Sequence, residues 1–237
     1  MSDTIVIIPT YNNALTLEDV VKRCLELGLP LLVIDDGSTD GTACILETLD
    51  VKHLTHEKNR GKGVALRTGL REARKQGYRY AVTIDSDGQH YPEDIPALLE
   101  AKGERTLVVG SRNLKADGMP SGNSFANKFS NFWFRLQTLH NLPDTQTGLR
   151  VYPLSSIPGL WLLTSRYEAE LTLLVFSAWK GLKLKPVPVR VAYPEDRVSH
   201  FRPFADFFRI SVLNTVLCIF ALIYGYPRML LNLILRK

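Results

Sequence analysis

The first half of the chain alternates short apolar runs, rich in β-branched residues, with segments whose apolar residues recur at helical spacing. Such runs indicate buried strands, and strands that alternate with helices indicate a parallel sheet with right-handed crossovers. The 237 residues are 45% hydrophobic and 22% charged, which supports a globular domain with a sizeable core. We therefore predict an α/β fold, with strands at 4–8, 31–34 and 51–54 and helices at 15–27 and 42–49.

A further apolar run, 80–84, ends abruptly in the segment 85–89, which reads Asp-Ser-Asp-Gly-Gln. Carboxylate and amide oxygens on a turn suit a hard divalent cation, and the carboxyl edge of an α/β sheet is where ligands bind. Asp, Ser and Gly also favour ordinary solvated turns. Taken alone, this stretch leaves a metal site and a solvated turn open.

Polar loops follow two earlier strands at the same edge of the predicted sheet. The first contains Tyr11, whose ring can stack on a base or pack in the core. The second begins with Asp35 and Asp36, which can accept hydrogen bonds from a nucleobase N–H or from ribose hydroxyls. Helix capping explains Asp40 but not this pair. The two loops favour a nucleotide ligand.

Residues 59–69 place two glycines and the cations Arg60 and Lys62 at the start of a helix that runs to about Lys75. A helix N-terminus with nearby cations is a good anion site, although a solvated basic loop has the same composition. The glycine spacing is not that of a Walker A loop, and no Lys-Ser/Thr pair follows.

These segments, in this order, resemble those of the family 2 glycosyltransferases, and within that family the dolichyl-phosphate and polyprenyl-phosphate sugar transferases. The matching stretches are 8–12 (Ile-Pro-Thr-Tyr-Asn), 35–41 (Asp-Asp-Gly-Ser-Thr-Asp-Gly), 59–63 (Asn-Arg-Gly-Lys-Gly) and 85–89. The resemblance covers the first half of the chain, with softer matches to about residue 203. It implies the GT-A fold, a Rossmann-like, mostly parallel sheet flanked by helices. It also implies a nucleotide-sugar donor, a divalent metal and inversion at the anomeric carbon.

The same resemblance implies roles for individual residues. Asp85, Asp87 and Gln89 correspond to the site for Mg²⁺ or Mn²⁺ and the diphosphate. The family has an acidic residue where this chain has Asn13, which weakens the contact expected there. The nucleotide-sugar site would comprise Pro9, Tyr11, Asn13, Asp35, Asp36, Arg60, Lys62, Asp85 and Asp87.

The second half carries the residues expected on the acceptor side. A strand at 106–109 precedes Arg112, a helix is expected at 123–139, and an edge strand with two prolines is expected at 185–191. The aromatic stripe of that helix is more typical of a core than of a binding site. By resemblance, candidates for catalysis are Asp87, Glu170, Asp144, Arg112 and Arg202, and candidates for binding an acceptor phosphate are Arg112, Arg197, His200 and Arg202. Segment 197–203 departs from the family's basic loop, which leaves the acceptor open.

Two kinds of acceptor would use these residues differently. A polyprenyl phosphate is already an oxyanion, so it needs cations rather than a strong base. A hydroxyl acceptor needs a carboxylate base, for which Glu170, Glu168 and Asp144 are the candidates.

The C-terminal residues are strongly apolar. Residues 210–226 carry no charge, Pro227-Arg228 interrupts the run, and 229–235 resume it. A bilayer span needs about 20 apolar residues. We therefore predict two helices in or on a membrane interface, with a true span and a buried core helix as the alternatives. The expected division is a GT-A catalytic domain over 1–203 and a membrane-associated segment over 204–237.

The net charge and the cysteine content limit which partners and which cellular compartment are expected. The net charge of +5 favours anionic partners, but the basic residues are scattered, which argues against nucleic acid. The three cysteines lack metal-type spacing and suit a reducing compartment. No secretory signal pattern opens the chain. We expect an enzyme at the cytoplasmic face of the cell membrane.

The resulting prediction is a metal-dependent, inverting transfer of a sugar from a GDP- or UDP-sugar to a lipid acceptor, most simply a polyprenyl phosphate. Three alternatives stay open: a hydroxyl acceptor on a glycan or glycolipid, a nucleotidyltransferase, and a non-catalytic nucleotide-binding or membrane adaptor. A nucleotidyltransferase would need a glycine-rich, lysine-containing loop after the first strand, where this chain has 9–12 (Pro-Thr-Tyr-Asn).

Overall fold

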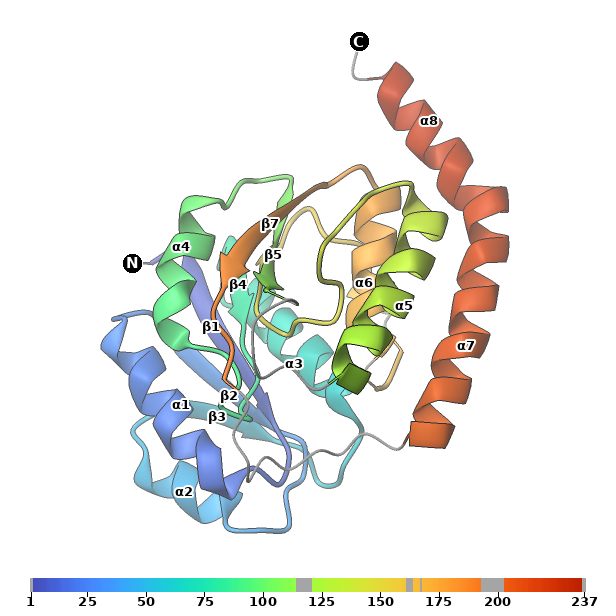
Figure 1. Cartoon of the computed structure of the whole chain (residues 1–237). Helices are drawn as coiled ribbons and strands as arrows, with labels where there is room; N and C mark the ends of the chain where they lie inside the picture. Colours follow the sequence, from blue (N-terminus) through green and yellow to red (C-terminus); the bar gives the residue numbers. More distant parts are fainter. Residues whose placement is uncertain (1, 114–120, 161–163, 167, 193–202, 236–237) are drawn as a thin grey trace.

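The computed structural model describes residues 2–113, 121–160, 164–166, 168–192 and 203–235. Its centre is a seven-stranded sheet in the order β3-β2-β1-β4-β6-β5-β7 (Figure 1). β6 runs antiparallel to both of its neighbours and the other pairs are parallel, so the predicted mostly parallel α/β sheet is confirmed. The strands are β1 (Thr4–Thr10), β2 (Leu31–Asp35), β3 (Lys52–Thr55), β4 (Tyr80–Thr83), β5 (Thr106–Arg112), β6 (Arg150–Pro153) and β7 (Lys183–Val189).

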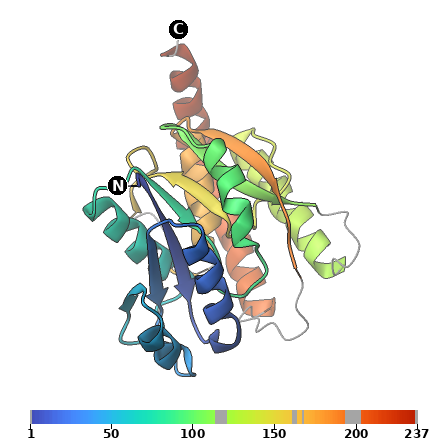
Figure 2. The same ribbon diagram turned by 90° about the vertical axis from the view of Figure 1, so that its left-hand side faces the viewer.

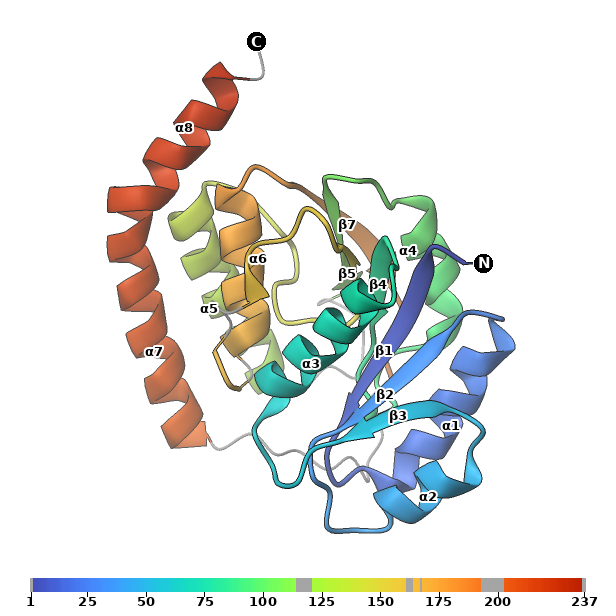
Figure 3. The same ribbon diagram turned by 180° about the vertical axis from the view of Figure 1, so that it is seen from behind.

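Helices cover both faces of this sheet, because successive strand side chains point to opposite faces. Ile5 and Ile7 of β1 pack into a core with α3, α5 and α6, whereas Val6 and Ile8 pack with α1, α2 and α4 (Figures 1 and 3). The helices are α1 (Ala14–Glu26), α2 (Thr42–Thr48), α3 (Lys62–Lys75), η1 (Pro92–Asp94), α4 (Ile95–Glu100), α5 (Ser121–Thr138), α6 (Glu168–Trp179), α7 (Pro203–Phe220), η3 (Ala221–Gly225) and α8 (Tyr226–Ile234).

The first strand is longer than predicted, because Pro9 does not end it. β1 stays paired with β2 as far as Thr10, which lies opposite Asp35. Pairing between β1 and β4 ends earlier, at Ile7. Alternation along the strand directs the nitrogen of Pro9 toward the β4 side, beyond the last paired residue, so its missing N–H costs no ladder hydrogen bond.

The C-terminal segment also differs from the prediction of two separate helices. α7, the π-helical turn η3 and α8 follow one another without a break, and Pro227 lies in the first turn of α8, where a missing N–H is tolerated. The resulting helix runs from Pro203 to Ile234, and its stretch Phe208–Ile234, of 27 residues, is long and apolar enough to cross a membrane by length and composition. α7 runs beside α5 and α6, and α8 extends beyond the body of the protein (Figures 1 and 2).

The core role predicted for the apolar stripe of α5 is wrong for its described members. Phe132 is 60% and Leu136 is 45% exposed, Phe129 and Trp133 are half-buried, and the fully buried aromatic residue is Phe134, which lies outside that stripe. The helix packs through Phe134 and through polar residues such as Asn127 and Gln137, which find hydrogen-bond partners inside. The predicted edge strand is confirmed as β7, at the end of the sheet.

Candidate active site

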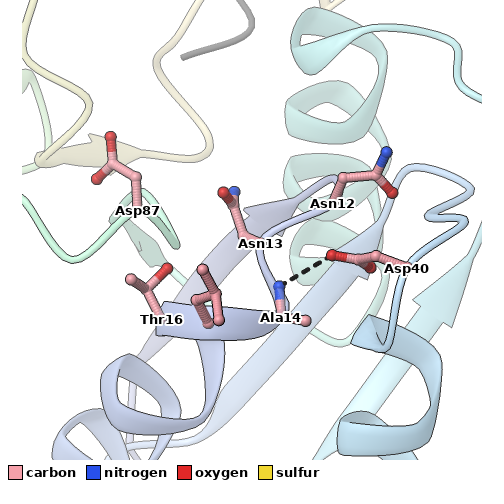
Figure 4. A pocket seen from close by; sticks show the side chains of 7 residues that line it. Asn12, Asn13, Ala14, Thr16, Asp40 and Asp87 are labelled. Atoms are coloured by element: carbon pink, nitrogen blue, oxygen red, sulfur yellow. Dashed lines mark hydrogen bonds between the residues drawn. The ribbon is translucent and has the colours of Figure 1, made fainter. Parts of the chain in front are cut away.

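The loops after β1 and β4 meet at the carboxyl edge of the sheet. Asn13 Nδ2 donates a hydrogen bond to Ser86 Oγ (2.8 Å), and Thr16 Oγ1 donates to the Ser86 carbonyl (2.6 Å). A pocket opens between them, and Asn13, Thr16 and Asp87 converge on it in Figure 4. Its lining residues are Asn12, Asn13, Ala14, Leu15, Thr16, Asp40 and Asp87. The structure thus brings Asn13 and Asp87 together, while Pro9 is buried within β1 and Tyr11 is half-buried beside it.

Asp40 shapes one wall of this pocket. Its Oδ2 accepts a hydrogen bond from the Ala14 N–H (3.1 Å) and its Oδ1 accepts one from the Thr42 N–H (2.9 Å). The carboxylate of Asp40 therefore accepts hydrogen bonds from the first N–H groups of both α1 and α2, in agreement with the capping role predicted for it.

The neighbouring carboxylates Asp35 and Asp36 are both buried but have different surroundings. Asp36 accepts hydrogen bonds from the backbone N–H groups of Arg60 (3.0 Å) and Gly61 (2.6 Å), and His56 Nδ1 lies 2.7 Å from its Oδ1. Asp36 thereby holds the basic loop in place. Asp35 Oδ1 accepts from the N–H and hydroxyl of Ser38, but its buried Oδ2 has no hydrogen-bond partner among the described residues. An orphaned buried carboxylate oxygen is unusual and fits a ligand donor.

Lys62 joins a residue predicted for the donor side to one predicted for the acceptor side. Its Nζ donates to Asp85 Oδ1 (2.7 Å) and to Glu170 Oε2 (2.9 Å). Burial favours the neutral carboxyl, but the charge of Lys62 outweighs it and holds the pKa of Asp85 below its usual range. The same two carboxylates raise the pKa of Lys62 against the effect of burial. Asp85 and Lys62 are therefore both charged at neutral pH.

Two glycines allow the loop that carries Lys62 to approach α6 closely. The Gly63 N–H donates to the Ser165 carbonyl (3.0 Å), and a Cβ at Gly63 would lie 2.6 Å from Ala169 Cβ. Gly61 has φ +94°, a conformation that favours glycine. The glycines flanking Lys62 thus serve backbone contact with α6.

Asp85 and Asp87 offer the carboxylates for a metal. Asp85 lies against Gly148, and Asp87 Oδ1 accepts a hydrogen bond from the Gln89 N–H (3.0 Å). Within the described residues, no three His, Cys, Asp or Glu side chains form a ready-made metal cluster. Mg²⁺ is usually held by one or two carboxylates together with substrate phosphates, so the donor set fits a metal whose coordination a diphosphate completes.

The acceptor-side residues Arg112 and Asp144 are paired with each other. Arg112 donates from Nε (2.5 Å) and from a terminal nitrogen (2.9 Å) to the two oxygens of Asp144, which is fully buried. Asn127 Nδ2 also donates to Asp144 (2.6 Å). Burial raises the pKa of Asp144, but these donors, chiefly Arg112, more than compensate and lower it overall. Glu168 is half-exposed in the first turn of α6. Arg197, His200 and Arg202 lie outside the described residues.

Sequence reasoning missed several residues that build this site. His56 and Asn127 act only through carboxylates far away in the sequence, 20 and 17 residues distant. Gly148 and Arg150 stand in the segment predicted for the acceptor side, but neither had a role. The contact between Gly148 and Asp85 could not be inferred from the sequence, because it depends on β6 lying next to β4 in the sheet.

His90 produces a testable pH dependence. Its ring is buried, and burial, partly offset by the charge of Asp85, lowers the pKa of His90 to about 4 from its ordinary value of 6.5. Between pH 6.5 and 4 the unfolded chain binds a proton that the folded chain does not. The free energy of unfolding should therefore decrease as the pH is lowered from 6.5 to 4, by roughly 3 kcal/mol from His90.

Urea unfolding at pH 7 and pH 4 measures this loss. The variant His90→Gln should lose less stability on acidification than the parent, because glutamine does not titrate. His53→Gln, at an exposed histidine, is the matched control and should behave like the parent. Equal losses in His90→Gln and the parent would contradict the assignment.

Comparison with known proteins places this site in a family. The model of glycosyl transferase family 2 matches residues 5–156. The chain belongs to glycosyltransferase family 2. Over 222 residues this glycosyltransferase is 31% identical to the UDP-N-acetylglucosamine–dolichyl-phosphate N-acetylglucosaminyltransferase of Methanococcus voltae, covering 82% of this chain and 88% of that protein. It is 31% identical to the undecaprenyl-phosphate mannosyltransferase of Micrococcus luteus over 197 residues, covering 77% and 81%.

Solved structures agree on the fold of this glycosyltransferase. Glucosyl-3-phosphoglycerate synthase from Mycobacterium tuberculosis, solved with Mn²⁺, UDP and glucosyl-3-phosphoglycerate, superposes with a TM-score of 0.68 at 20% identity. The likeness covers 92% of this chain and 79% of that one. The predicted GT-A fold is confirmed. Membership of the family decides for an enzyme of the glycosyltransferase class over the nucleotidyltransferase and non-catalytic alternatives.

Proposed function

We propose that this glycosyltransferase transfers a sugar from a GDP- or UDP-sugar to a lipid phosphate of the polyprenyl type, at the cytoplasmic face of a membrane. The observation that carries the proposal is the likeness, over 82% and 77% of the chain, to transferases named for dolichyl-phosphate and undecaprenyl-phosphate. The relatives suggest the class of acceptor. They leave the sugar and the nucleotide to experiment.

The nucleoside would bind at the loops after β1 and β2. Asp35 Oδ2, buried and without a partner among the described residues, is placed to accept a hydrogen bond from a base or ribose. Asn13 and Asp87 face the adjoining pocket. Arg60 is exposed on the loop that Asp36 fixes at the start of α3, where a diphosphate would gain from cations and from the helix dipole.

A bound Mg²⁺ or Mn²⁺ ion would neutralise the charge that develops on the leaving diphosphate. Asp85, Asp87 and the Gln89 amide are the residues that would hold it. Lys62 keeps Asp85 ionised and oriented through its ion pair. The acceptor would attack from the opposite face of the sugar, which inverts the anomeric carbon.

The pairing of the carboxylates supports a phosphate acceptor over a hydroxyl. A general base needs an accessible carboxylate that can take a proton. Asp144 is buried in its bidentate pair with Arg112, and Glu170 is bound to Lys62. Of the three candidate bases, this leaves the half-exposed Glu168 for a hydroxyl acceptor. A phosphate oxyanion needs none of them as a base. It needs cations, and Arg112 together with Arg197 and Arg202 are the proposed ones.

Thermal stabilisation by nucleoside diphosphates with Mg²⁺ or Mn²⁺ tests the donor site. One of GDP and UDP should raise the Tm of the parent. Asp35→Asn keeps an oxygen for Ser38 but replaces Oδ2 by an NH₂ group. Because a hydrogen bond to a charged group is worth about 1.5–3 kcal/mol, we expect affinity to fall at least about 10-fold. Asp50→Asn, at an exposed aspartate, is the control. Failure of every nucleoside diphosphate to stabilise the parent would contradict the proposed function.

The C-terminal segment, 204–237, is proposed to lie along the membrane. One side of α7 is bound to the catalytic domain: Asn214, Leu217 and Ala221 are buried, and Gln137 Nε2 donates to Asn214 Oδ1 (3.0 Å). The same side of α8 contacts α6, where Asn232 Nδ2 donates to the Trp179 carbonyl (3.0 Å), while the outward side of both helices is apolar and exposed. These outward residues are Phe208, Val212, Val216, Ile219, Phe220, Leu222, Ile223, Leu230, Leu233 and Ile234. A helix fixed to the domain on one side favours an interfacial position over a free span.

Flotation with vesicles that contain phosphatidylglycerol tests this position. The double variant Phe220→Asp, Ile223→Asp should weaken vesicle binding about 100-fold, since each residue would otherwise bury a large apolar side chain worth about 1.5–3 kcal/mol. Leu25→Asp changes an exposed leucine on α1, away from this surface, and should float like the parent. Unchanged flotation of the double variant would rule out contact between this surface and lipid.

A further inference from the structure

Arg150 is the first residue of β6 and is completely buried. Its guanidinium donates three hydrogen bonds to backbone carbonyls: Nε to Thr147 (2.9 Å), and its two terminal nitrogens to Glu170 (2.7 Å) and Thr145 (3.0 Å). Among the described residues, no carboxylate lies within ion-pair distance of it. Burial disfavours this charge, but the neighbouring Tyr152, Glu170 and Asp144 more than offset it and raise the pKa of Arg150, so the guanidinium is charged and directs its three hydrogen bonds at carbonyls.

The three carbonyls belong to two segments that touch the centre of the site. Thr145 and Thr147 lie in the loop 144–148, which begins with the partner of Arg112 and ends at the glycine beneath Asp85. Glu170 lies in the first turn of α6 and contacts Lys62 through its side chain. In the ion pairs Asp85–Lys62–Glu170, Asp85 lies against the loop 144–148 and Glu170 lies in the first turn of α6. The guanidinium of Arg150 connects this loop to this turn.

The loop does not need Arg150 merely to hold its shape. Asn131 Oδ1 accepts a hydrogen bond from the Thr145 N–H (3.1 Å), and Thr83 Oγ1 donates to the Gly148 carbonyl (2.8 Å). Asn127 binds Asp144. These contacts tie the loop to α5 and β4. What Arg150 adds is the bond to the Glu170 carbonyl, which ties the same loop to α6.

We propose that Arg150 is a positioning residue, which fixes the loop 144–148 relative to the first turn of α6 and so sets the placement of Asp85 against Lys62 and Glu170. The consequence for catalysis rests on the proposed function; the effect on local structure does not. Arg150 itself stays behind the site and contacts neither donor nor acceptor. A lysine at this position would keep the charge, but it lacks the planar fork that reaches three carbonyls at once.

The test compares Arg150→Lys and Arg150→Met with the parent, all as full chains. Arg74→Met is the matched control, because Arg74 donates to a backbone carbonyl, that of Leu154, at the far end of β6. Three measurements are made: affinity for the stabilising nucleoside diphosphate with Mn²⁺, kcat for transfer, and amide hydrogen exchange over 144–149 and 168–174. Hydrogen exchange needs no substrate.

For Arg150→Lys we expect kcat to fall about 100-fold, as for other small misplacements of reacting groups. Nucleotide affinity with Mn²⁺ should fall far less, by no more than about 10-fold, because Asp85 is only one of the residues proposed to bind the metal and the nucleotide. Exchange over both segments should be at least about 10-fold faster, while the Arg74→Met control changes neither kcat nor these segments. Unchanged exchange in Arg150→Lys would overturn the proposal, and so would a kcat within threefold of the parent. A parallel fall of nucleotide affinity, kcat and Tm would also overturn it, because that pattern marks general destabilisation. If the parent transfers no sugar, the proposed function fails, and the exchange measurement alone decides on Arg150.

Discussion

Asp87→Ala should lower sugar transfer about 1000-fold while leaving the protein folded. Asp87 lines the pocket beside Asn13, whereas Asp85, the other carboxylate proposed for the metal, forms an ion pair with Lys62. Loss of a metal-binding carboxylate removes several kcal/mol of stabilisation from the charge on the leaving diphosphate. We expect the fold to be kept, because Asp87 lies on a loop at the edge of the sheet, where its Oδ1 accepts a hydrogen bond from the nearby Gln89 N–H.

The loss is measured as the initial rate of sugar transfer to a short polyprenyl phosphate at increasing Mn²⁺ concentrations. The donor is the nucleotide sugar whose nucleoside diphosphate stabilises the parent. Asp50→Ala removes an exposed aspartate and provides the control for charge alone. The variant should also lose the part of nucleotide stabilisation that depends on metal, whereas stabilisation without metal should persist. An Asp87→Ala enzyme with the parent's rate and metal dependence would rule out the metal site proposed for Asp85, Asp87 and Gln89.

Local patterns were enough to predict the donor-side half of the sheet. β-branched runs gave β1, β2 and β4, and the polar loops after them lie together because parallel strands end at one edge. The capping role of Asp40 was also predictable, since it depends on residues two positions away in the sequence. These features depend on short-range periodicity and on turn-forming residues, both of which can be recognised in the sequence.

The roles that failed to emerge depend on distant backbone groups. Asp35 and Asp36 look equivalent in the sequence, yet Asp36 is occupied by N–H groups 24 and 25 residues away and Asp35 is not. Lys62 forms ion pairs with Asp85 and with Glu170, the latter 108 positions along the chain, while its contact with a diphosphate stays a prediction. Pro227 indicated a helix break, but the π-helical turn η3 leads directly into α8, and Pro227 lies in the first turn of α8, where a missing N–H is tolerated. Each outcome was set by tertiary contacts that no local pattern encodes.

Gly148→Ala should cost about 100-fold in kcat through the position of Asp85. A Cβ at Gly148 would lie 2.6 Å from Asp85 Cγ and 2.7 Å from Oδ1, closer than real Cβ contacts. The loop cannot easily retreat, because the Gly148 carbonyl accepts a hydrogen bond from Thr83 and the guanidinium of Arg150 holds Thr147. The carboxylate of Asp85 must therefore move, and a displacement near 1 Å at a reacting centre is enough for a loss of this size.

Gly77→Ala separates this effect from stability. Gly77 has φ +83° and open space around it, so an alanine there is strained by about 1–2 kcal/mol without touching the site. Overpacking at Gly148 costs a similar amount, about 1–3 kcal/mol. Both variants should show comparable losses in urea unfolding, but only Gly148→Ala should lose kcat. If the two variants lose kcat together, or if Gly148→Ala keeps a kcat within threefold of the parent, then the placement of Asp85 on Gly148 does not govern the reaction.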